Sequence, residues 1–171
     1  MGKVLLGFLL GLLVLPAIAA AIALGGHFPI QATAKPPMWE RRLANMALDP
    51  AVAKASEGLT NPISTPTDDD LLKGMKTYRD NCSGCHGDHG KPSGWGRNNL
   101  YPPAPQFADR GDHDPVPEIF VVVRDGIRYT GMGGQRGLMS ENDLWRVSTF
   151  LSRIKTLPPA VDQAWKTPPA E

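Results

Sequence analysis

The chain contains two cysteines, Cys82 and Cys85, which stand three positions apart and are followed directly by His86. No other cysteine is present, so a disulfide scaffold and a zinc site of four cysteines are excluded. A C-x-x-C-H pattern indicates one covalently attached haem c, because this spacing lets both sulfurs reach the porphyrin while the histidine turns towards the iron. A thioredoxin-like redox pair and half of a zinc site are the alternatives, but the sequence lacks their surrounding patterns.

Length and charge limit what else the chain can be. Its 171 residues allow one modest domain with attachments. The 18 lysines and arginines nearly balance 17 acidic residues, so no broad basic surface is expected and nucleic acid is not an expected partner. The 17 prolines and 18 glycines gather outside the segments with helical periodicity, which indicates a compact helical domain with long connections.

The N-terminal segment has the character of a membrane anchor. Residues 4–24 carry no charge, and a helix of this length spans roughly the 30 Å core of a bilayer. We expect residues 1–26 to form a single transmembrane helix, with a cleaved signal peptide as the alternative. The flanking charges do not favour placing the remainder outside, because Lys3 stands alone before the run while Lys35, Arg41 and Arg42 follow it. We nevertheless expect the chain after this helix to lie on the periplasmic side of a bacterial inner membrane, because of the haem chemistry that the C-x-x-C-H motif indicates.

Residues 27–66 are expected to be a linker rich in proline, alanine and threonine. It contains one short amphipathic helix over residues 39–55, which Pro50 is expected to kink or end. Trp39, Leu43 and Met46 recur there at helical spacing. This pattern suits a helix that lies at a membrane surface or against a neighbouring subunit, and packing on its own domain is the alternative.

Residues 67–157 are expected to form the globular domain, with three helices. The first starts at the capping residues 67–70, the second runs over 117–126, and the third starts at Ser140 and stops before Pro158. Large apolar side chains are few for a domain of this size, so something other than side chains is expected to fill part of the interior. Residues 158–171 are expected to be a proline-rich tail.

Over residues 71–157, about half of the chain, the sequence resembles the class I c-type cytochromes. The matching features are the C-x-x-C-H motif, Gly74, Tyr78, Gly87, the segments 124–127 and 130–132, Trp145 and Phe150. This resemblance implies an all-α domain of three to four helices around the haem, in which the first and last helices cross at Gly74, Tyr78 and Phe150. The sequence departs from many relatives at Gly133, where they have a proline.

The resemblance also implies the ligands of the haem iron. His86 is expected as one axial ligand and Met132 as the other, since Met132 follows a glycine-bounded turn. Met139 is the reserve candidate but stands directly before the Ser140 helix start, and His113 is a further reserve. Ligation by histidine and methionine raises the potential of a haem towards values suited to electron transfer.

Other residues are expected around the haem. In the family a proline-rich stretch after the motif supplies the carbonyl that binds the ligand histidine, and residues 101–105 are the stretch available here. Tyr101, Pro102 and Arg128 are expected to line the haem pocket.

A haem with both axial positions filled by the protein has no place for a substrate, so we expect an electron carrier and not an enzyme. The expected partners are membrane lipid and the electron-transfer complexes of a respiratory or photosynthetic chain, with the protein as a permanent subunit or a tethered shuttle. The alternatives are a haem enzyme or gas sensor with a displaceable sixth ligand, and an assembly protein whose haem is structural.

Overall fold

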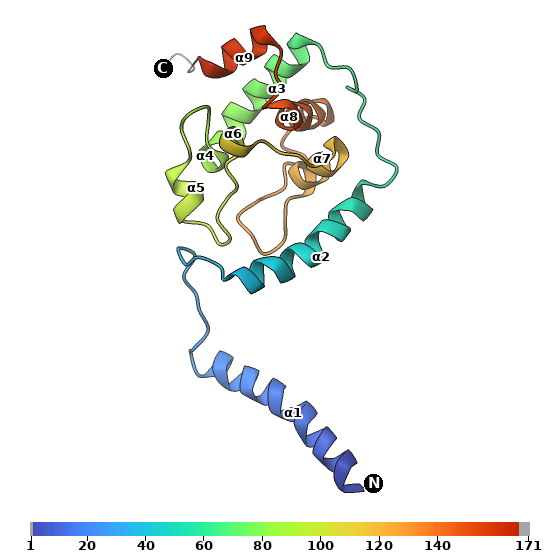
Figure 1. Ribbon diagram of the computed structural model, residues 1–171, viewed down its shortest axis with the longest axis vertical. Coiled ribbons are helices and arrows are strands. Elements are labelled where there is room, and N and C mark those ends of the chain that lie inside the picture. The colour runs from blue at the N-terminus through green and yellow to red at the C-terminus, as the bar shows by residue number, and fades with distance from the viewer. Residues whose placement is uncertain (1, 168–171) are drawn as a thin grey trace. The chain divides into compact units, whose positions relative to one another are not determined.

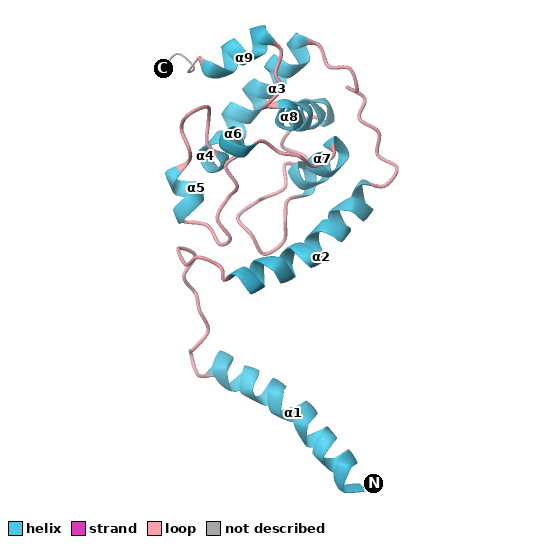
Figure 2. Cartoon of the chain, in the orientation of Figure 1, coloured by secondary structure: helices cyan, strands magenta, loops and turns pink. Residues whose placement is uncertain are grey.

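A computed structural model describes residues 2–167 of the protein (Figure 1), apart from the side chains at positions 4–6, 9, 109 and 110. The chain forms two compact units, residues 1–31 and 32–171. Within the described range Figure 2 shows helices and loops without a strand, which confirms the all-α expectation. The helices are α1 (Gly2–Leu24), α2 (Met38–Ser56), α3 (Asp68–Asn81), α4 (Ser83–His86), α5 (Gly94–Asn98), α6 (Phe107–Arg110), α7 (Val116–Asp125), α8 (Glu141–Arg153) and α9 (Pro159–Lys166).

Helix α1 covers the uncharged run of the sequence, as expected. Among the helices that the structure describes, however, none has the length and apolar character needed to cross a membrane. The expected span includes four side chains, at positions 4–6 and 9, that lie outside the described residues. The predicted helix is therefore present, and the predicted membrane crossing is not confirmed.

The two long helices of the domain begin where their capping residues predict. Thr67 accepts a hydrogen bond from the Asp70 amide at 3.2 Å, and the Asp70 carboxylate accepts one in return from the Thr67 amide at 3.2 Å. Ser140 accepts a hydrogen bond from the Asp143 amide at 3.2 Å. These bonds satisfy amides that have no partner inside the helix and so fix the starts of α3 and α8.

Helices α3 and α8 cross in the centre of the domain (Figure 1). A Cβ atom at Gly74 would clash with the Arg146 carbonyl, so only glycine allows this approach. Beside the crossing, Tyr78 and Phe150 are fully buried with ring centroids 5.9 Å apart. The crossing that the family resemblance implied is therefore present.

Helix α7 completes the central packing against α8. Its Phe120 ring stacks on Trp145 with centroids 3.7 Å apart. The helix ends at Gly126, which adopts a φ of 71° that side-chain-bearing residues rarely take. This turn directs the chain into the loop that carries Met132.

The domain is larger at its C-terminal end than the sequence indicated. Residues after 158 were expected to be a proline-rich tail, but residues 159–166 form α9, which packs on α3. Val161 and Trp165 are 0% and 2% exposed, and the Trp165 ring lies 5.7 Å from Tyr78 and 5.3 Å from Phe150. Arg79 holds the helix in place by donating a hydrogen bond of 2.7 Å to the Trp165 carbonyl.

The expected linker is likewise part of the folded unit. Leu59 and Ile63 pack against the core, and the side-chain Nδ2 of Asn61 donates a hydrogen bond of 3.2 Å to the Thr149 hydroxyl on α8. Helix α2 lies against α7 and continues through Pro50 instead of ending there. Pro50 is exposed, so water can hydrate the Met46 carbonyl that loses its amide partner.

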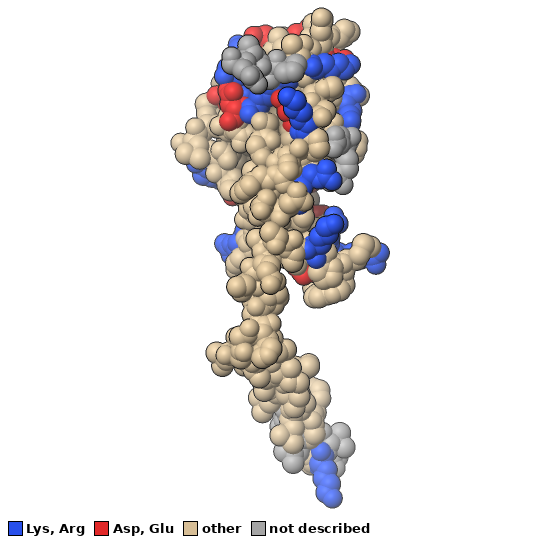
Figure 3. Space-filling model, turned by 90° about the vertical axis from the view of Figure 1, so that its left-hand side faces the viewer, with Lys and Arg blue, Asp and Glu red and all other residues tan. Residues whose placement is uncertain are grey.

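Charge on the domain surface is mixed in sign. Figure 3 shows basic and acidic side chains on the same face. Several are paired one helical turn apart, as in Lys73–Asp69, Lys76–Asp80 and Lys166–Asp162. Exposed pairs of this kind add little to stability, and no large field of one sign follows from them.

Candidate functional site

The junction between α3 and α4 positions the C-x-x-C-H motif. Cys82 ends α3, with its amide donating to the Tyr78 carbonyl at 2.8 Å, and the next turn begins at once. The His86 amide donates to the Cys82 carbonyl at 2.9 Å, which closes that turn. Both thiols and the imidazole consequently line the same cavity.

His86 is held in one tautomer. Its Nδ1 lies 2.8 Å from the Pro105 carbonyl oxygen, and because a carbonyl only accepts hydrogen bonds, Nδ1 must carry the proton. The lone pair of Nε2 is then free to bind a metal. Burial lowers the pKa of His86, which favours this neutral form, and the ring stacks on Phe107 at 4.7 Å. Pro105 lies within the stretch expected to supply this carbonyl.

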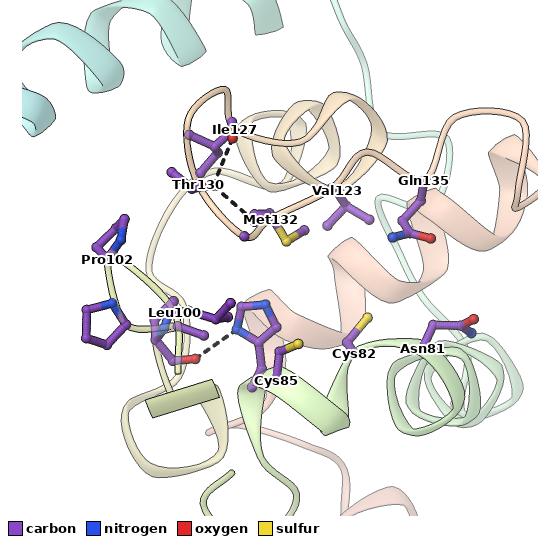
Figure 4. A pocket seen from close by; sticks show the side chains of 16 residues that line it. Asn81, Cys82, Cys85, Leu100, Pro102, Val123, Ile127, Thr130, Met132 and Gln135 are labelled. Carbon is purple, nitrogen blue, oxygen red and sulfur yellow. Dashed lines mark hydrogen bonds between the residues drawn. The ribbon is translucent and has the colours of Figure 1, made fainter. Parts of the chain in front are cut away.

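Met132 belongs to the opposite wall of the cavity. Figure 4 shows its side chain on the loop after α7, facing the side that carries Cys82 and Cys85. Local hydrogen bonds define this loop: the Thr130 hydroxyl donates to the Ile127 carbonyl at 2.8 Å and accepts from the Met132 amide at 3.0 Å. The Ile127 amide in turn donates to the Met132 carbonyl at 3.0 Å.

The loop stays close to α7 because glycine stands where backbones touch. A Cβ atom at Gly134 would lie 2.7 Å from the backbone carbon of Asp125. The Gln135 amide donates to the Val123 carbonyl at 3.0 Å, which continues this contact. At Gly133, by contrast, where many relatives have a proline, a Cβ atom would meet nothing within 4 Å, so packing does not require glycine at this position.

The reserve ligands lie elsewhere. Met139 packs against the hydrophobic core, and His113 is exposed. Neither lines the cavity. Of the two methionines considered, the structure therefore brings only Met132 into one site with His86.

The donor set of the cavity fits a c-type haem. Cys82 and Cys85 are free thiols, and burial raises the pKa of Cys82 to about 11, so its side chain is uncharged in an apolar setting. One imidazole and one thioether complete the set. Among the described residues no cluster of three or more His, Cys, Asp or Glu side chains offers a site for a simple metal ion.

The comparison with protein families agrees with this geometry. The family model described as cytochrome C oxidase, cbb3-type, subunit III matches residues 69–151, just under half of the chain. The matched domain is a class I c-type cytochrome. No curated protein resembles the chain closely enough to count as a match.

Three further residues were expected in the haem pocket of this cytochrome domain, and one of them lines the cavity. Pro102 does, whereas Tyr101 turns away and donates its hydroxyl proton to the Glu40 carboxylate of α2 at 2.7 Å. Arg128 is exposed beside Tyr129 and is also absent from the lining. The lining residues are Asn81, Cys82, Cys85, His86, Leu100, Pro102, Pro103, Ala104, Pro105, Val123, Ile127, Thr130, Gly131, Met132, Gly133 and Gln135.

Sequence reasoning missed Gln106, which supports the site from behind. Its side chain is 8% exposed, and its Oε1 accepts a hydrogen bond from the Ser93 amide at 2.7 Å. Its Nε2 lies 3.0 Å from both the Cys85 carbonyl and the Ala104 carbonyl, to which it donates. One side chain thus joins the attachment motif to the segment whose Pro105 carbonyl holds His86.

Proposed function

We propose that this cytochrome carries single electrons through one haem attached to Cys82 and Cys85, with His86 and Met132 as the two axial ligands. The observation that carries the proposal is that His86 and Met132 line one cavity from separate segments, while Met139 and His113 lie outside it. A haem with both axial positions taken changes oxidation state without binding a substrate.

The chain's own residues serve this role by fixing the ligands. The Pro105 carbonyl keeps the Nδ1 proton of His86 in place, so Nε2 remains unprotonated. The Thr130 hydroxyl bonds hold the Met132 backbone in its turn. A site that is already arranged needs little reorganisation when the charge changes by one electron, which favours rapid transfer.

Optical spectra test the ligand assignment. The wild type is expected to show the weak methionine-to-iron band of the ferric state. That band should disappear in Met132→Ala and persist in Met139→Ala, the matched control. Rapid and complete binding of carbon monoxide to the reduced wild type would contradict the proposal and favour a haem enzyme or gas sensor.

The attachment is tested separately. Denaturing electrophoresis should leave haem-dependent peroxidase staining on the polypeptide, because the thioether bonds survive unfolding. Loss of the pigment from the wild-type band would show that the cysteines do not hold the haem covalently.

We further propose that the domain serves a respiratory oxidase as a subunit. The description of the matching family model supports this. Native sizing after extraction in mild detergent tests it: co-migration with oxidase subunits is expected, and a lone monomer would rule out a permanent subunit.

The uncharged run 4–24 is the support for proposing attachment to the bacterial inner membrane, with the haem domain on the periplasmic side. Protease added to intact spheroplasts should digest the haem domain. Protection of the domain until the membrane is broken would contradict the proposed side.

A further inference from the structure

Helix α2 has two different faces. Glu40, Leu48 and Val52 are partly buried on the side towards the rest of the domain, where α2 lies against α7. The other side carries four large apolar side chains, Met38, Trp39, Leu43 and Met46, with exposed fractions of 66%, 68%, 61% and 74%. We call these four residues the α2 face. At a helical repeat of 3.6 they share one side of α2, which is hollowed between Trp39, Arg42 and Met46.

The α2 face is unusual for this domain. Among the described residues of the unit 32–171, the other large apolar side chains that are exposed are Trp95, Tyr129 and Leu138, which come from separate segments. Single exposed apolar residues are ordinary, whereas a contiguous group on one element marks a contact surface.

Positive charge lies at the start of this face. Arg42 lines the same hollow as Trp39 and Met46, and Lys35 stands three residues before Met38. Both are exposed, and no ion pair among the described residues involves them. Glu40, the acidic residue among them, turns inwards to accept the hydrogen bond of Tyr101. A positive residue near a helix N-terminus opposes the helix dipole, so the fold itself does not favour Arg42 there.

We propose that the α2 face docks on an anionic lipid bilayer, with the four apolar side chains at the boundary of the acyl chains and Lys35 and Arg42 bound to lipid phosphates. A helix with one apolar side, a tryptophan and a basic edge has the character of an interfacial helix. Charge complementarity favours this occupant, because an anionic bilayer presents phosphates directly beside its apolar layer, whereas a neutral apolar protein surface would leave the two cations without partners. The inference depends neither on the haem nor on a membrane-spanning α1.

Quenching by brominated lipid tests the docking in the full-length holoprotein. Trp145 and Trp165 are buried, so a Trp95→Phe background leaves Trp39 as the accessible tryptophan. Its fluorescence is compared in brominated and unbrominated vesicles of phosphatidylcholine, with or without phosphatidylglycerol. The ratio of the fluorescence in brominated vesicles to that in unbrominated vesicles cancels quenching by the haem and reports only contact of the indole with lipid.

The bromine quenching is expected to be at least about twofold stronger in the anionic vesicles and to weaken in high salt. Reversing the charges with Lys35→Glu/Arg42→Glu should remove that difference, as should Trp39→Phe. Leu138→Glu, at an exposed leucine away from α2, is the matched control and should leave the quenching unchanged.

Either of two results would overturn the proposal. Equal quenching in neutral and anionic vesicles would remove the role of the cations. Absence of quenching in both, together with a stoichiometric protein bound to α2, would show that the face belongs to a protein interface.

Discussion

Replacing Gln106 by leucine tests whether one buried amide holds the haem-binding segments together. Leucine has a similar size and keeps the apolar contacts, but it loses the hydrogen bonds to Ser93, Cys85 and Ala104. Each bond of this kind contributes about 1 kcal/mol net, and a polar group left without a partner costs about 1–3 kcal/mol. The three partners are only partly buried, so water compensates for some of the loss.

We therefore expect Gln106→Leu to lower the free energy of unfolding by about 2–3 kcal/mol. With an m-value of about 2 kcal/mol/M, the urea midpoint should fall by roughly 1–1.5 M. The assay is urea unfolding of the holoprotein followed by circular dichroism at 222 nm. Gln163→Leu, at an exposed position of α9, is the matched control and should change the midpoint little.

Gln106→Glu adds a pH dependence whose sign follows from the same contacts. A carboxylate accepts from the Ser93 amide but faces two carbonyl oxygens, so we expect its pKa in the folded state to lie above the usual value of about 4.3. The folded state then binds more protons than the unfolded state, and stability falls as the pH rises above about 4.3. A loss below about 0.5 kcal/mol in Gln106→Leu, or a flat pH profile for Gln106→Glu relative to the wild type, would refute the reasoning.

Three further predictions concern the Met132 loop, the packing of α9 and the start of α3. Gly134→Ala should cost about 1–3 kcal/mol in thermal unfolding, because the new Cβ meets the Asp125 backbone, while Gly133→Ala should be nearly neutral; equal effects would contradict the close approach. Trp165→Ala should cost about 3–5 kcal/mol in urea, and the exposed Trp95→Ala under about 0.5 kcal/mol. The Thr67 hydroxyl and Arg146 lower the pKa of Asp70, so Asp70 stabilises the fold above about pH 4, and this contribution is lost on acidification. Asp70→Asn should therefore be less stable than the wild type at pH 7, with a difference that shrinks below about pH 4 in acid titration.

Sequence patterns predicted the elements whose signals are local. The start of α3 depends on residues three positions apart, Thr67 and Asp70, and the start of α8 on Ser140 and Asp143 in the same way. The C-x-x-C-H motif also depends on spacing alone, and its residues Cys82, Cys85 and His86 line one cavity in the structure. Those features required no knowledge of distant contacts.

The features that sequence reasoning missed depend on contacts between distant segments. Gln106 bonds to groups 13 and 21 residues away, and a single glutamine gives no pattern that reveals them. The prolines around α9 suggested a tail, although the spacing of Val161 and Trp165 by four residues was the available signal of a buried helix face. Tyr101 was assigned to the pocket from its neighbours in sequence, whereas its hydroxyl group found a partner 61 residues earlier.

The position of α9 also has a consequence for the order in which the protein is made. Trp165 covers Tyr78 and Phe150, which are among the most deeply buried rings of the domain, yet it leaves the ribosome more than 80 residues after Tyr78. Until α9 has been synthesised, Tyr78 and Phe150 lack this cover, so the side of α3 that leads into Cys82 cannot be closed to water before then.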